Sequence, residues 1–192
     1  MNAMLFVFTS CEFQSYKEYA FAEYDGAFEW TQVTKHADWP DRFGHAAVAF
    51  DGKIWIFGGY NPGEMKADTY YEDVWNSTDG IEWNLITENA PWLGRRGHSV
   101  IVFNDGSGDA MFLAGGFTVN EETGYREYAN DVWKSTNGAD WEMIKERSYP
   151  ELDATDDWFP RFNHALVKAN HNGTDYLFVI GGASMLENHS AR

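Results

Sequence analysis

The chain has 192 residues, of which 17% are aromatic and 44% hydrophobic, with 18 glycines and only 5 prolines. This composition fits one packed, β-rich domain and excludes a disordered or collagen-like chain, and no stretch approaches the roughly 18 uninterrupted apolar residues of a membrane span. Thirty acidic against fourteen basic residues give a formal net charge of −16, which repels phosphate backbones and excludes nucleic acid as an expected partner.

Residues 1–18 are predicted to form a separate N-terminal segment. The apolar run Met4–Phe8 leads to Thr9, Ser10 and the single cysteine, Cys11, which resembles the end of a bacterial lipoprotein signal. The segment lacks a basic n-region, so the remnant of an export signal and a buried strand with an ordinary thiol both stay open. The first alternative predicts an extracytoplasmic protein, periplasmic or lipid-anchored at Cys11.

From residue 19 onwards the sequence repeats itself. A half-unit at 19–34 is followed by complete units at 42–87 and 95–145 and by a second half-unit at 161–183. Each unit that shows its start opens on Arg, with His three residues later and then two apolar runs that close on a glycine pair. The two complete units continue with two Trp eight residues apart. The recurring residues are Arg42, His45, Gly58, Gly59, Trp75, Trp83, Arg95, His98, Gly115, Gly116, Trp133, Trp141, Arg161, His164, Gly181 and Gly182.

Each complete unit predicts four short strands, A to D. Asp51-Gly52 lies between A and B, and Asp79-Gly80 and Asn137-Gly138 lie between C and D. These pairs are tight-hairpin signals because both central residues of such a turn need positive φ. The unit is therefore predicted to be a four-stranded antiparallel meander.

The glycine pair that ends strand B, the later Trp of strand D and a repeat of roughly 50 residues resemble kelch repeats. The Asp-Val-Trp of strand C, followed by Ser-Thr-Asp/Asn-Gly, is similar to a subtype frequent in bacterial kelch-type proteins. The resemblance covers about residues 19–183 and implies an all-β fold of kelch-type β-propeller blades, similar to the central domain of galactose oxidase. It says little about function, because kelch propellers serve many roles.

The strands amount to about three blades, whereas closed propellers have about four to eight. Three accounts stay open. The remaining blades belong to a longer chain, or a homodimer closes a six-bladed ring about a two-fold axis, or the chain is an open arc whose edges are blunted by charge.

Residues that recur in every unit are expected to serve folding, so function is sought where the units differ. In such a meander the B–C and D–A connections emerge on one face. The candidate ligand-binding residues on this face are Tyr60, Glu64, Tyr70, Tyr71, Glu121, Tyr125, Arg126 and Tyr128 from the B–C loops, and Trp39, Trp92, Trp158, Asp156 and Asp157 from the D–A connections. Aromatic rings beside carboxylates suit stacking on sugars or holding a basic protein loop. The alternative is that the rings fill gaps between blades and the acids only solvate the loops.

The sequence predicts a non-enzymatic binding module for a protein or a glycan. The alternative, implied by the resemblance to kelch-like enzymes, is a carbohydrate-active propeller such as a sugar mutarotase or epimerase, which needs an acid or base over the anomeric centre. No cofactor and no metal are expected. No phosphate-binding glycine motif occurs, and the three His, each at the start of a different strand, are predicted to satisfy backbone groups. The Cys–Tyr crosslink that galactose oxidase uses is not expected, because the only cysteine lies at the extreme N-terminus.

Overall fold

The structure is a computed structural model that describes residues 20–21, 30–63, 69–119, 124–150 and 157–184. The segment 1–18 with Cys11, and the candidate acids Glu64, Glu121 and Asp156, lie outside the described residues. Within the described residues all regular structure is β-strand, and no helix is long and apolar enough to cross a membrane.

Two complete antiparallel sheets form the middle of the protein. The first runs in the order β3 (Ala46–Phe50), β4 (Lys53–Asn61), β5 (Thr69–Ser77) and β6 (Asn84–Thr87). The second contains β8 (Ser99–Asn104), β9 (Asp109–Val119), β10 (Arg126–Ser135) and β11 (Glu142–Lys145), and the short β7 (Arg95–Arg96) also pairs with β9.

A two-stranded sheet flanks them on each side, β1 (Ala20–Phe21) with β2 (Trp30–Thr31), and β12 (Ala165–His171) with β13 (Thr174–Ile180). The predicted all-β fold of four-stranded antiparallel meanders is confirmed.

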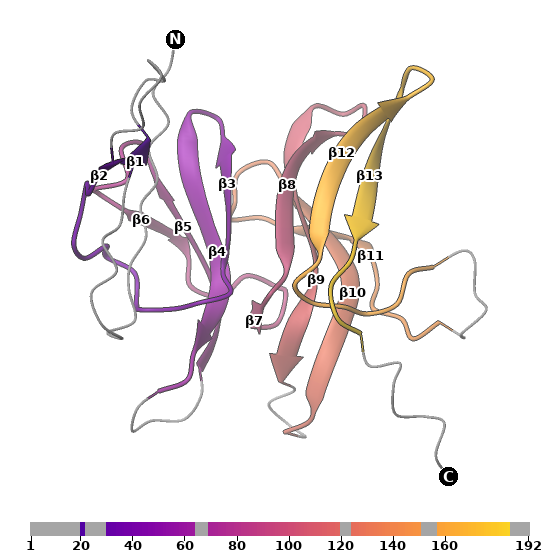
Figure 1. Cartoon of the computed structure of the whole chain (residues 1–192), viewed down its shortest axis with the longest axis horizontal. Coiled ribbons are helices and arrows are strands. Elements are labelled where there is room, and N and C mark those ends of the chain that lie inside the picture. Colours follow the sequence, from indigo (N-terminus) through magenta and orange to yellow (C-terminus); the bar gives the residue numbers. More distant parts are fainter. Residues whose placement is uncertain (1–19, 22–29, 64–68, 120–123, 151–156, 185–192) are drawn as a thin grey trace.

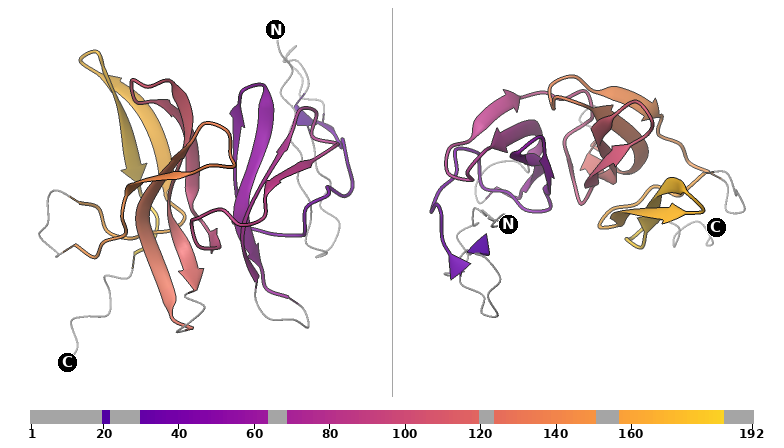
Figure 2. Two further views of the ribbon diagram at one scale, coloured as in Figure 1. Left: turned by 180° about the vertical axis from the view of Figure 1, so that it is seen from behind. Right: turned by 90° about the horizontal axis from the view of Figure 1, so that it is seen from above.

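The sheets stand one behind the other in an open arc, as the view from above in Figure 2 shows. The first strands of successive sheets, β3, β8 and β12, contact one another (Figure 1) and so line the inner side of the arc. Each of the two complete sheets is therefore a blade with a neighbouring sheet on either face.

The main hydrophobic core lies between the two complete blades. Trp55 and Phe57 of β4 and Val74 of β5 pack with Met111 and Leu113 of β9. On its other face the first blade packs a smaller cluster of buried residues, Trp39, Ile56 and Trp83. The apolar strands are buried between blades, so packing of one blade on the next supplies most of the hydrophobic stabilisation.

A buried arginine joins the start of each complete blade to its second and third strands. Arg95 donates two hydrogen bonds to the Asp131 carboxylate, at 2.7 and 2.9 Å, and one to the Gly115 carbonyl at 2.9 Å. Burial acts to raise the pKa of Asp131, but the hydrogen bonds and charge of Arg95 outweigh it and lower that pKa. The indole of Trp133 also donates to Asp131, at 3.0 Å.

The first blade repeats this arrangement with Arg42, Asp73, Gly58 and Trp75. Arg161 donates to the Gly181 carbonyl at 2.8 Å in the same way, but the third strand of its blade is not among the described residues. Arg, Gly, Asp and Trp thus recur together because they form this one hydrogen-bonded group in each complete blade.

The glycine pairs allow neighbouring blades to approach closely. A Cβ on Gly58 would lie 3.0 Å from His98 Cε1 of the next blade, and one on Gly115 would lie 2.6 Å from His164 Cε1. Both glycines also have positive φ, of 54° and 65°. Any larger residue would push the next blade away.

A second contact between blades is made by backbone alone. The Gly97 N–H donates to the Gly44 carbonyl and the Asn163 N–H donates to the Gly97 carbonyl, each at 2.7 Å. All three residues precede a first strand and have φ between 53° and 65°. These bonds fix how the blade starts follow one another around the arc.

We expect Gly138→Ala to destabilise the fold by about 2–4 kcal/mol, because a Cβ there would lie 2.2 Å from Trp55 Cζ3 at a φ of 76°. Gly173→Ala is the matched control, since its φ is 82° but nothing lies within 4 Å of its Cβ, so only backbone strain of about 1 kcal/mol is expected. Urea unfolding of the two variants measures the difference. Equal losses would contradict the tight contact between the blades.

Candidate functional site

Aromatic side chains gather where the second strand ends and the third strand begins in each of the two complete blades. Tyr60 of β4 pairs in register with Tyr70 of β5, and their ring centroids lie 4.6 Å apart. Phe117 and Tyr128 make the equivalent pair in the second blade, at 5.3 Å. Tyr70 and Phe117 lie 6.0 Å apart and join the two pairs across the blade boundary.

Arg96 stands at the centre of these rings. Its guanidinium carbon lies 5.1 Å from the ring centroids of both Tyr60 and Phe117, 5.7 Å from Phe43 and 6.0 Å from Phe162. Phe43 and Phe162 occupy in the neighbouring repeats the position that Arg96 occupies in its own. We call Phe43, Tyr60, Tyr70, Phe117, Tyr128 and Phe162 the aromatic cluster.

Beside the aromatic cluster a pocket of about 640 Å³ opens between the two complete blades. Its walls are Thr69, Tyr70, Glu72, Leu93, Gly94, Val119, Gly124 and Arg126. The Glu72 carboxylate accepts the Gly94 N–H at 3.1 Å, and the Thr118 hydroxyl donates to the Gly94 carbonyl at 2.6 Å. These bonds hold the loop before β7 against both blades and shape the pocket.

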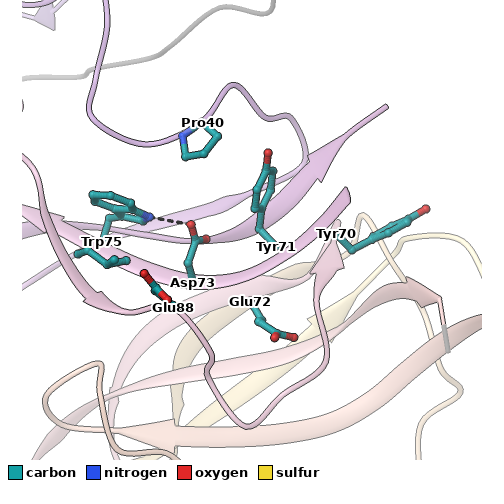
Figure 3. A pocket seen from close by; sticks show the side chains of 8 residues that line it. Pro40, Tyr70, Tyr71, Glu72, Asp73, Trp75 and Glu88 are labelled. Atoms are coloured by element: carbon teal, nitrogen blue, oxygen red, sulfur yellow. Dashed lines mark hydrogen bonds between the residues drawn. The ribbon is translucent and has the colours of Figure 1, made fainter. Parts of the chain in front are cut away.

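A smaller pocket of about 280 Å³ lies on the first blade beside Pro40 (Figure 3). Its Asp73 is engaged by Arg42 and Trp75, and the Tyr71 ring centroid lies 4.0 Å from the Arg42 guanidinium carbon. In Figure 3 the Tyr70 and Tyr71 side chains point in different directions. Burial raises the pKa of Tyr71, although the charge of Arg42 opposes the shift. Tyr71 therefore packs against the buried Arg42 of its own blade, whereas Tyr70 lines both pockets.

Comparison with known proteins now adds to this geometry. Residues 41–76 match the family model of the kelch motif. The solved structure of YjhT is 20% identical to this chain, with a TM-score of 0.56. The first complete blade therefore carries a kelch motif, and the chain has the fold of part of a β-propeller. The alignment covers 88% of this chain and 46% of that structure, so the chain spans about half the length of its structural neighbour. No curated protein matches the sequence.

The kelch blades place the predicted site residues in different environments. Tyr60, Tyr70 and Tyr128 meet in the aromatic cluster, and Arg126 lines the larger pocket. Tyr125, 74% exposed, stands close to it in sequence, between Gly124 and Arg126. Arg96, Phe43, Phe117 and Phe162 were not identified from sequence. The signal that could have found Arg96 is its departure from the Phe of the other two repeats.

Two of the predicted tryptophans are corrected. Trp39 and Trp92 are only 2% and 1% exposed and pack inside the two hydrophobic cores, so their indoles cannot stack on a ligand. Trp158 is half-buried against His164, with ring centroids 5.8 Å apart.

Asp157, the one acid of the predicted set that the structure describes, is bound by side chains of its own blade. It accepts a hydrogen bond from Ser148 and pairs with Lys145 at 3.1 Å. Lys145 ends strand β11 and Ser148 follows it closely, so Asp157 ties the long D–A connection to its own blade.

Of the three recurring histidines, His98 and His164 are buried and His45 is half-buried, and lowered pKa values keep all three neutral at pH 7. Burial and the neighbouring Arg95 lower the pKa of His98 to about 3, and burial lowers that of His45 and of His164 to about 4. The ring nitrogens of His98 and His164 make no hydrogen bond of normal geometry, although the backbone at Phe57 and at Ala114 acts to raise their pKa values. That the imidazoles satisfy backbone groups therefore stays a prediction. Both rings pack on the glycines of the preceding blade. No group of His, Cys, Asp and Glu in the described part of the chain is arranged to hold a metal.

We expect the free energy of unfolding to fall as the pH drops from about 6.5 to 5. The unfolded histidines bind protons below pH 6.5, whereas the folded ones, with lowered pKa values, do not. Each contributes up to about 1.4 kcal/mol per pH unit. Urea unfolding at pH 7, 6 and 5 measures the slope.

His98→Gln is expected to reduce that slope by about a third, since one of three groups is removed. Ile81→Ser, at a position 47% exposed, is the control, since it removes no titrating group and leaves the slope unchanged. A stability that stays constant between pH 6.5 and 5 would show that the three imidazoles titrate normally in the folded protein.

Proposed function

We propose that this kelch propeller segment is a non-enzymatic binding module for a protein or glycan ligand. The ligand is held on the face where β4 and β9 end and β5 and β10 begin. The observation that carries the proposal is the aromatic cluster joined through Tyr70 to a pocket of about 640 Å³. Concave sites with exposed rings and a few polar groups are typical of ligand binding. The kelch motif indicates a propeller or protein-interaction module, which agrees with this role.

Two of the three acids that line the pockets, Glu72 and Asp73, are held by the fold, which favours binding over catalysis. Asp73 is held in a bidentate pair with Arg42, and Glu72 accepts the N–H of Gly94. A general acid or base has to exchange a proton with its substrate, and a carboxylate that already carries these bonds is committed to the fold. A location outside the cytoplasm remains a proposal that rests on the sequence around Cys11.

We expect Tyr125→Ser and Arg126→Ser each to weaken ligand binding about tenfold without loss of structure, because exposed Tyr and Arg side chains beside a pocket commonly contribute this much. Binding of the wild-type chain and its variants to a glycan array and to a displayed peptide library measures the effect. Ile81→Ser is the control, since Ile81 is 47% exposed in the turn at the opposite end of the blade. Unchanged binding by both variants would remove this face from the proposal.

The arc also exposes a surface that further blades would cover. Tyr176, Phe178 and Ile180 of β13 are 44–55% exposed, although most residues of the equivalent strands β4 and β9 in the complete blades are buried. Arg161 already donates to the Gly181 carbonyl but meets no aspartate in the described residues. Both features point to a missing third strand that carries an aspartate.

A second copy of this chain would not provide a third strand with the required aspartate. The strand it would offer is the one around β1. In the sequence Tyr19 stands there in place of the aspartate, because it precedes Asp25-Gly26 by six residues, as Asp73 precedes Asp79-Gly80. A tyrosine cannot accept two parallel hydrogen bonds from a guanidinium as a carboxylate does. We therefore propose that blades of a longer chain, rather than a homodimer, complete the propeller. The coverage of 46% of the neighbouring structure supports this choice.

Light scattering during size-exclusion chromatography of the 192-residue chain tests the proposal. We expect no discrete species at twice the chain mass of 21.9 kDa, because the exposed sheet lacks its matching strand. A stable dimer of that mass that survives dilution would support the two-fold ring instead.

A further inference from the structure

Arg96 differs from the other arginines at the starts of the kelch blades. Arg42 and Arg95 each form a bidentate pair with an aspartate. Arg96, one residue after Arg95, forms no ion pair and no hydrogen bond through its side chain within the described residues. Its Nε atom is buried without any partner, and burial of an unpaired donor is costly. The chain carries 30 acidic residues, so the lack of a carboxylate here is not due to a shortage of them.

The rings around Arg96 leave its donors unused. Aromatic rings attract a guanidinium through their π faces, and such contacts do not consume its N–H groups, which lie in the guanidinium plane. Four ring centroids lie within 5.1–6.0 Å of its central carbon. The cluster therefore holds the cation in place without occupying its in-plane donors.

The fold itself does not require a cation at this position. Phe43 and Phe162 occupy it in the neighbouring repeats, and each follows the first arginine of its blade as Arg96 follows Arg95. A phenylalanine at position 96 would extend the aromatic cluster without removing a charge from water. The substitution of Arg for Phe therefore has a cost for folding and needs a different explanation.

We propose that Arg96 binds the carboxylate of a ligand that rests on the aromatic cluster, an assignment that rests on the proposed binding function and names its ligand chemistry. A carboxylate matches the fork of a guanidinium and would occupy donors that have no partner in the described structure. The Phe43 ring, 43% exposed, offers a surface for the apolar face of the same ligand.

The charge of the protein restricts this ligand further. At a net charge of −16 the chain repels a polyanion before it reaches the site, whereas a ligand with one carboxylate meets little opposition. We infer a ligand with a single carboxylate on a compact, uncharged body. A sugar acid and a single glutamate of a protein partner share that chemistry.

Two pairs of probes that differ only in the carboxylate test the proposal. The first pair is methyl β-D-glucuronide against methyl β-D-glucoside, and the second is acetyl-Phe-Glu-amide against acetyl-Phe-Gln-amide. Saturation-transfer NMR with the 192-residue chain measures their affinities. We expect the acidic member of at least one pair to bind about tenfold more tightly than its neutral counterpart, and the pair that shows the preference identifies the source of the carboxylate.

Arg96→Phe is the matched variant, because it restores the residue of the neighbouring repeats and is expected to fold at least as well as the wild type. It should remove the preference for the acidic probe, and Arg96→Lys should retain part of it. Lys53→Met, which removes a positive charge at the A–B turn on the opposite end of the blade, should leave the preference unchanged.

The result distinguishes this assignment from the general binding role. If Arg96→Phe binds acidic and neutral probes as the wild type does, or if neither acidic probe is preferred, the carboxylate assignment is wrong. The binding module is judged separately, by the loss of array binding in Tyr125→Ser. An Arg96-dependent preference together with that loss supports both.

Discussion

The buried pair of Arg95 with Asp131, repeated as Arg42 with Asp73, is the interaction on which the rest of this structure depends. It joins the start of a blade to its second strand through a glycine carbonyl and to its third strand through a carboxylate. Two buried charges are expensive to remove from water, and their attraction offsets that cost only when the geometry is good. We regard the pair as a device that fixes strand register more than one that adds stability.

The position of the pair also decides what the next residue does. Successive side chains of an extended segment point to opposite sides. With Arg95 directed into its own blade, Arg96 is directed towards the neighbouring blades, where Phe43 and Phe162 take the equivalent place. The scaffold and the candidate ligand contact thus come from adjacent residues of one motif.

Close approach of the blades is the second constraint. Gly58 and Gly115 leave space for His98 and His164 of the following blade, and the imidazoles fill that space in their neutral form. The same approach brings Tyr70 within 6.0 Å of Phe117 and forms the larger pocket between the blades. A looser stack would separate the residues that make the site.

The sequence by itself determined the repeat, the four-stranded meander, the kelch type and the residues that serve every blade, because strand period, turn chemistry and recurrence are local properties. It also placed Tyr60, Tyr70 and Tyr128 on one face. Only the tertiary structure decided that Trp39 and Trp92 are buried, and that Arg96 meets rings from three successive repeats. Those outcomes depend on how one blade packs against the next, and contacts between segments far apart in sequence leave no periodic pattern from which they could be predicted.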